Sequence, residues 1–157
     1  MKDPLIYLLI VLIVLVILYS LYQLVKKHLE KKSKHVKKIK QTLETYGRLE
    51  EKEHFMSYEY QNQHYSLLIF KVPSGSKFTF NSRTIWERRF GQKKIYSDQS
   101  LFSKMPHKKI VVIYPHEGPF MYHYDENEIR FTNYKERIWD MHIISINELE
   151  KALKEGF

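Results

Sequence analysis

The chain has 157 residues, with 26 Lys and Arg against 18 Asp and Glu, for a net charge of +8. The absence of cysteine excludes a disulfide scaffold and a thiol nucleophile. The five glycines are scattered singly, which excludes a glycine-rich phosphate-binding loop. The length allows one small folded domain besides the N-terminal segment.

The stretch from Pro4 to Val25 has 22 residues without a charged side chain. As a helix it would extend roughly 33 Å, against about 30 Å for the hydrocarbon core of a bilayer. Tyr7, Tyr19 and Tyr22 lie near its ends, where aromatic rings favour the membrane interface. The sequence therefore predicts a transmembrane helix. A cleavable signal peptide would need a small-residue cleavage site, which Tyr19–Tyr22 does not offer. A helix lying on the membrane surface would need a polar face, which this stretch lacks.

A lysine-rich segment follows directly. Segment 26–40 carries a net +7, so residues 41–157 carry only +1. The positive-inside rule then predicts a single-pass protein of the cell membrane, with its N-terminus outside and its C-terminal domain in the cytoplasm. We interpret the lysines as contacts to anionic lipid, with a nucleic-acid-binding arm as the alternative. The predicted membrane-surface contacts are Lys26, Lys27, Lys31, Lys32, Lys34, Lys37, Lys38 and Lys40.

The same segment has the apolar spacing of a helix. A short seam resembling a coiled coil is interrupted by Lys32, which favours packing on the chain's own domain over oligomerisation. Gly47 is the expected break. The seam consists of Leu29, Val36, Ile39, Leu43 and Tyr46. We therefore expect an anchor at 1–25, a basic juxtamembrane helix at 26–45 and a domain at 46–157.

The first half of that domain is predicted to be an antiparallel meander. Three segments have the apolar patterns of strands, either alternating or in a continuous run: Phe55–Tyr60, His64–Val72 and Lys77–Trp86. Gln61–Gln63 and Pro73–Ser76 are the expected turns between them.

The second half mixes helices and strands. The β-branched run Lys109–Tyr114 is typical of a strand covered on both faces. The other expected elements are a short helix at Asp98–Met105, a short helix or loop at Phe120–Asn127, strands at Glu128–Thr132 and Met141–Ile146, and a terminal helix capped by Asn147. This order predicts an α+β domain with a mixed sheet covered by helices.

This order, with IVVIYP after the meander and HIISINELEKAL at the end, resembles the restriction-endonuclease-like (PD-(D/E)XK) fold. It resembles in particular small nuclease-related domains of membrane-anchored bacterial proteins, over roughly residues 43–153. The resemblance implies a site where two carboxylates hold a divalent metal and a lysine positions the attacking water.

Matched residue by residue, the resemblance gives a degenerate site. Ser66 takes the place of the first acid, and Asn81 and Arg83 take the places of the second acid and the lysine. An amide is a weaker metal ligand than a carboxylate, and Arg cannot deprotonate. Glu87 is a displaced alternative for the acid. The resemblance thus implies neither a metal nor a catalytic residue.

Two other groups of residues are notable. His116, Glu117, His123 and Asp125 are competent metal ligands, but their spacing fits no standard zinc pattern. The many aromatic residues could stack on bases or form a protein-binding face.

The sequence therefore favours a single-pass, membrane-anchored protein whose cytoplasmic domain is a non-catalytic binding or scaffold module for a protein partner, without a cofactor. The alternative is a membrane-anchored, nuclease-like protein that processes nucleic acid.

Overall fold

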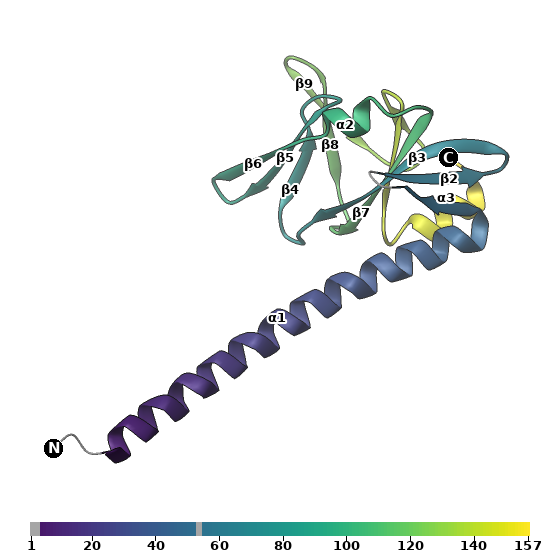
Figure 1. Cartoon of the computed structure of the whole chain (residues 1–157). Helices are drawn as coiled ribbons and strands as arrows, with labels where there is room; N and C mark the ends of the chain where they lie inside the picture. Colours follow the sequence, from purple (N-terminus) through teal and green to yellow (C-terminus); the bar gives the residue numbers. More distant parts are fainter. Residues whose placement is uncertain (1–3, 53–54) are drawn as a thin grey trace. The chain divides into compact units, whose positions relative to one another are not determined.

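The computed structural model describes residues 4–52 and 55–157, with side chains described at 10–26, 34–52 and 55–157. Helix α1 (Pro4–Tyr46) opens the chain (Figure 1). The molecule divides into two compact units, Met1–Lys37 and Lys38–Phe157. The division falls inside the predicted juxtamembrane helix.

The predicted membrane span is not supported. No helix among the described residues is long and apolar enough to cross a membrane. The uncharged stretch is the first part of helix α1, which continues through the lysine-rich segment to Tyr46. The single-pass anchor, and the membrane location and orientation that we inferred from it, are corrected accordingly.

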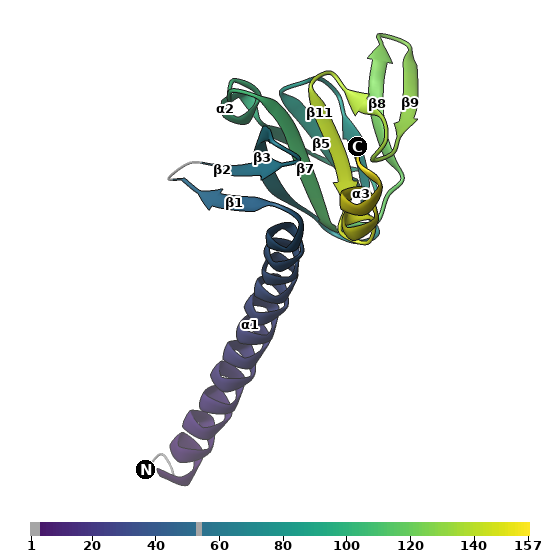
Figure 2. The same cartoon turned by 90° about the vertical axis from the view of Figure 1, so that its right-hand side faces the viewer.

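The second unit contains two sheets (Figures 1 and 2). The first has the strand order β1-β2-β3-β7-β11-β10, and the second has the order β6-β5-β4-β8-β9. The strands are β1 (Arg48–Glu51), β2 (Met56–Tyr60), β3 (Gln63–Val72), β4 (Lys77–Phe80), β5 (Ile85–Phe90), β6 (Lys93–Asp98), β7 (Lys108–Pro115), β8 (Phe120–Asp125), β9 (Glu128–Thr132), β10 (Arg137–Ile138) and β11 (Met141–Ser145). The short helices are α2 (Ser100–Ser103) and α3 (Leu149–Glu155).

The six-stranded sheet is mixed. β1, β2 and β3 pair antiparallel, while β7 lies between β3 and β11 and is parallel to both. The predicted polar turn joins β2 to β3, with Gln61 and Asn62 at positive φ as a two-residue hairpin requires. Nearly every side chain of β7 and all of β11 are buried, which confirms the predicted strand covered on both faces.

The five-stranded sheet corrects two predictions. The expected strand Lys77–Trp86 is two antiparallel strands, because the chain turns at Asn81–Thr84 and the backbone N–H of Ile85 donates to Ser82 Oγ. β4 therefore leaves the meander and joins the second sheet. The expected helix or loop at Phe120–Asn127 is strand β8, parallel to β4 and antiparallel to β9.

The main core lies between the sheets. Trp86 of β5 is fully buried and makes edge-to-face contacts with Phe70 of β3 and Phe102 of α2. Such aromatic pairs add stability beyond the area that they bury. The α+β class and the mixed pairing are confirmed, but the single sheet covered by helices is wrong, because the second sheet covers one face of the first.

The other face of the six-stranded sheet is covered by helix ends. The hydroxyls of Tyr58 and Tyr60 donate to the backbone carbonyls of Leu43 in α1 and Leu153 in α3. Ile39 and Leu43 are fully buried, which confirms packing of this part of the seam on its own domain. α1 ends before Gly47, where a Cβ would overlap the carbonyl oxygen of Glu59.

α3 begins one residue later than predicted. Glu148, rather than Asn147, is its N-cap residue. The Ser145 hydroxyl accepts from the Glu148 backbone N–H and donates to the Glu148 carboxylate, which are hydrogen bonds that fix the chain just before the helix.

Candidate functional site

Along the five-stranded sheet, residues that alternate with the core residues Phe78, Phe80 and Trp86 form a second face, on the side away from the core. Residues in register across all five strands form one line on this face, because paired residues point to the same side of a sheet. We call this line the outer row. Its members, from β6 to β9, are Tyr96, Glu87, Thr79, Met121 and Phe131.

Glu87 is the polar centre of the outer row. It is only 7% exposed, and its carboxylate accepts two hydrogen bonds from Arg89 (2.9 and 3.1 Å) and one from Asn81 (3.2 Å). Burial raises the pKa of Glu87, but the hydrogen bonds from Asn81, Arg89 and Tyr96 outweigh it, so that its pKa lies below the ordinary value. Glu87 is therefore a fixed anion that orders its neighbours.

The β9 end of this face is apolar and exposed. Ile129 is 54% and Phe131 64% exposed, and they pair in register with His123 and Met121 of β8. β9 is also an edge strand, so one side of its backbone pairs with no other strand of the described sheet. An exposed edge with large apolar side chains is a known site of strand addition.

The other edges are less suited to strand addition. β1 carries Arg48, Glu50 and Glu51, β6 begins with two lysines, and β10 has only two residues. Charged side chains and short length are the usual ways in which proteins block edge pairing. Among the described edges, β9 is therefore the best candidate interface.

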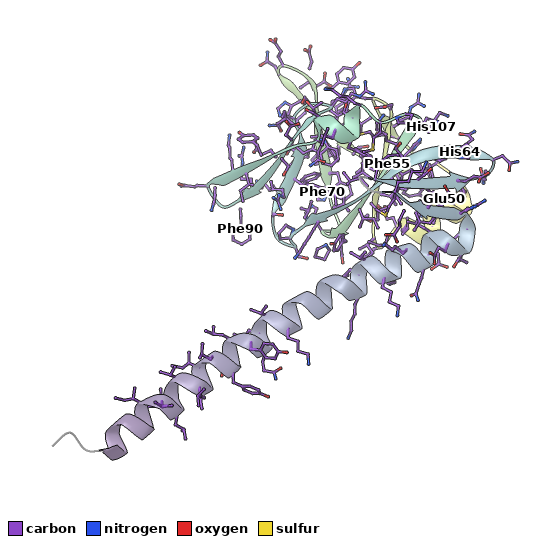
Figure 3. All side chains as sticks on the ribbon, viewed as in Figure 1. Glu50, Phe55, His64, Phe70, Phe90 and His107 are labelled. Atoms are coloured by element: carbon purple, nitrogen blue, oxygen red, sulfur yellow. The ribbon has the colours of Figure 1, made fainter. Side chains whose placement is uncertain are left out.

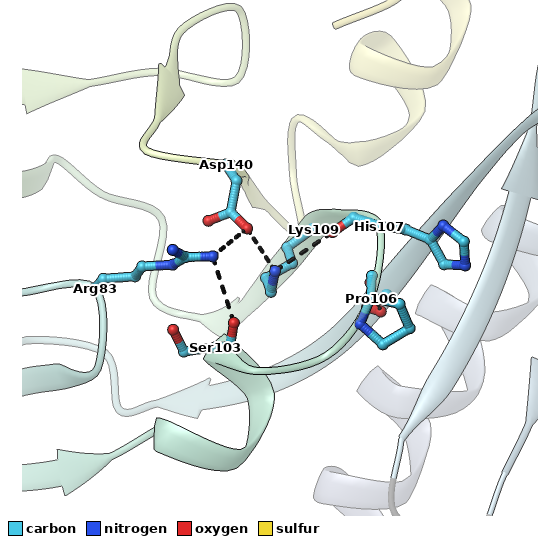
Figure 4. Close-up of polar contacts among 7 residues, drawn as sticks. Arg83, Ser103, Pro106, His107, Lys109 and Asp140 are labelled. Atoms are coloured by element: carbon cyan, nitrogen blue, oxygen red, sulfur yellow. Dashed lines mark hydrogen bonds and ion pairs between the residues drawn. The ribbon is translucent and has the colours of Figure 1, made fainter.

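Ser66 and Arg83, predicted as parts of a nuclease-like site, make polar contacts with other residues. The Ser66 hydroxyl donates to the Pro106 carbonyl at 2.6 Å. Arg83 pairs with Asp140 at 2.8 Å, and Asp140 also pairs with Lys109 (Figure 4). The structure thus brings Asn81 and Glu87 together, whereas Ser66 and Arg83 contact Pro106 and Asp140 instead.

Lys109 is the important residue that the sequence did not single out. It is 1% exposed, stands opposite Ser66 on β3, and also donates to the carbonyl of His107 (3.3 Å). A buried ammonium needs a counter-ion, which Asp140 provides. Its position at the start of a strand predicted to be covered on both faces could have indicated a buried lysine. The sequence could not indicate its partner, because Asp140 lies 31 residues away.

The candidate metal ligands separate into two places. His116 and Glu117 line a pocket of about 650 Å³ beside the Ser74–Lys77 loop. His123 and Asp125 line a smaller pocket of about 380 Å³ together with Asn81. No group of three or more His, Asp or Glu among the described residues could hold a metal ion.

The predicted lysine contacts are partly described. The side chains of Lys27, Lys31 and Lys32 lie outside the described residues. Lys40 is half-buried and pairs with Glu51 of β1. The remaining lysines, Lys26, Lys34, Lys37 and Lys38, are exposed. Their proposed lipid contacts stay a prediction.

No protein-family model, curated protein or solved structure matches this chain. The resemblance to restriction-endonuclease-like domains therefore stays a prediction.

Proposed function

We propose that residues 38–157 form a protein-binding module and that the partner docks on β9 and the adjoining outer face of the five-stranded sheet. The observation that carries the proposal is the pair of exposed side chains Ile129 and Phe131 on an edge strand that lacks blocking charges on that face. Burying large apolar side chains at an interface supplies most of its binding energy.

The proposed occupant is an extended segment of a partner protein that adds a strand beside β9. Backbone hydrogen bonds would supply affinity, and the side chains next to Ile129 and Phe131 would supply specificity. On the opposite face of β9, Glu128 and Arg130 pair with each other at 2.6 Å, so their charges do not oppose docking.

The geometry supports a nuclease less well. Both oxygens of the Glu87 carboxylate already accept hydrogen bonds from side chains, and the charge of Asp140 is balanced by two cations, which both contact its Oδ2. Two-metal and one-metal nucleases need carboxylates that are open to a divalent ion.

The proposal is tested by photo-crosslinking from the full-length chain in its native cells. A benzophenone amino acid replaces Phe131, and in a matched control it replaces Tyr124, which is 57% exposed, against 64% for Phe131, and lies on the opposite face of the same hairpin. We expect one discrete protein adduct from position 131, lost when Ile129→Asp is added, and none from position 124.

Equal adducts from both positions would contradict the proposed face. Cleavage of DNA or RNA with magnesium or manganese that Glu87→Ala abolishes would contradict the non-catalytic assignment.

A further inference from the structure

The hairpin of β5 and β6 is strongly basic, whereas the rest of residues 41–157 carries a net negative charge. Segment 88–94, RRFGQKK, carries four cations and no acid. Residues 41–157 carry +1 in total, so without this segment their net charge is −3. The hairpin is therefore a local basic site, distinct from the lysines of α1.

The pairing register brings like charges together. Arg89 stands directly opposite Lys94, and Phe90 stands opposite Lys93. Like charges across a strand pair are destabilising, and Glu87 offsets only the charge of Arg89. No described residue forms an ion pair with Lys93 or Lys94. The arrangement is one that an anionic ligand would relieve.

A third observation points to an anion. The Nε of Arg88 is buried and has no hydrogen-bond acceptor among the described residues. Its guanidinium lies 6.0 Å from the centre of the Phe70 ring, so it is held on an aromatic face. Arg88 alternates with Phe90 along β5, so its positive charge lies on the same face of the hairpin as Phe90 and Lys93.

An exposed ring accompanies the cations. Phe90 is 66% exposed at the end of β5. Figure 3 shows Phe90 projecting from the hairpin. Gly91, at a φ of 58°, makes the tight turn that places Lys93 beside Phe90. A large exposed ring at a hairpin tip has little structural role and is available for stacking.

We propose that the β5–β6 hairpin binds single-stranded nucleic acid. Lys93 and Lys94 would neutralise phosphates, while Phe90 would stack on an unpaired base. Phe90 beside Lys93 offers one ring and one cation to a base and its phosphate, and an acidic peptide offers no matching π-face. Phe90 and Lys93 point to the opposite side of the sheet from the outer row, so the inference goes beyond the proposed function.

The charge contacts are tested by fluorescence anisotropy of a labelled 20-residue oligothymidylate with the full-length protein over a range of salt. Lys93→Ala with Lys94→Ala should lower the slope of log affinity against log salt by about 1.4. Lys151→Ala with Lys154→Ala makes the same charge change on α3 and should leave the slope unchanged. The lysines of α1 are present in every variant, so their contribution cancels.

The stacking contact is tested separately. Phe90→Ala should weaken oligothymidylate binding roughly tenfold and leave binding of heparin, a polyanion without bases, unchanged. The fluorescence of a Phe90→Trp variant should be quenched by the oligonucleotide but not by heparin. Thermal unfolding of each variant checks that the fold is retained.

Oligonucleotide affinity of Phe90→Ala within twofold of the parent would overturn the proposal. So would equal loss of salt slope in the α3 control. Binding of polyglutamate with the same affinity and the same dependence on Phe90 would instead assign the hairpin to an acidic protein and also overturn it.

Discussion

The two sheets of the second unit differ in what their faces contact. In the six-stranded sheet, the central strands β7 and β11 are buried on both faces, and the only charged side chain buried in them is Lys109. In the five-stranded sheet, one face joins the core and the other carries exposed rings around the fixed anion Glu87. The first sheet therefore provides stability, and the second offers a surface for recognition.

The largest expected effect comes from the core side of the five-stranded sheet. Trp86→Ala removes a fully buried indole that contacts both sheets and α2. The lost burial and the cavity should lower the free energy of unfolding by about 4 kcal/mol. Urea denaturation followed by circular dichroism measures the loss. A change below about 1.5 kcal/mol would show that the two sheets do not share this core.

The next effect comes from the buried ion pair. Asp140→Ala leaves Lys109 without its counter-ion and should cost about 3 kcal/mol of unfolding free energy. Arg83→Ala removes the half-exposed partner of the same carboxylate and should cost less than about 1 kcal/mol. Both are measured by urea denaturation.

A rescue variant separates charge from packing. Adding Lys109→Met to Asp140→Ala removes the unpaired charge and should recover part of the stability, because a buried apolar side chain needs no counter-ion. Equal stability of the single and double variants would contradict a charged role for Lys109.

The sequence predicted local elements better than their assembly. The run Lys109–Tyr114 is apolar without alternation, so it was recognised as a strand buried on both faces. Phe120–Asp125 mixes aromatic and polar side chains without a clear period, and it was not recognised as a strand. The turn at Asn81–Thr84 contains no glycine or proline, so the end of β4 was missed and with it the second sheet.

The candidate site depended on that missed assembly. Asn81 and Glu87 were singled out as degenerate nuclease positions, yet their contact arises because β4 and β5 form a hairpin. Phe131 joins the same row only through the parallel pairing of β4 with β8. Such long-range pairing leaves no periodic signal in one sequence. Lys109 and Asp140 are equally non-local partners.

A smaller effect is expected from pH. Burial lowers the pKa of His142, and the nearby charges of Arg137 and Lys108 lower it further, although its ring donates to the backbone carbonyl of Tyr134. Burial also lowers the pKa of His116. A histidine with a lowered folded pKa binds its proton more readily when unfolded. Its stability contribution is therefore complete above about pH 6.5 and is lost as pH falls below that value.

This pH dependence is measured by urea midpoints between pH 7.5 and pH 5. We expect the midpoint of the parent to fall with pH, and His142→Gln with His116→Gln to flatten that fall, because glutamine does not titrate in this range. A parent midpoint that rises toward acid pH would contradict neutral buried histidines.

The smallest effect on stability is expected on the outer face. Ile129→Thr with Phe131→Ser removes two exposed apolar side chains and should change the free energy of unfolding by no more than about 0.5 kcal/mol. The same variant should lose the partner adduct from a benzophenone placed at His123, which stands opposite Ile129 on β8. A loss above about 1.5 kcal/mol would mean that β9 stabilises the fold, and the contrast between a structural sheet and a recognition sheet would then fail. Unchanged stability with a lost adduct would assign these side chains to recognition, because folding would not depend on them.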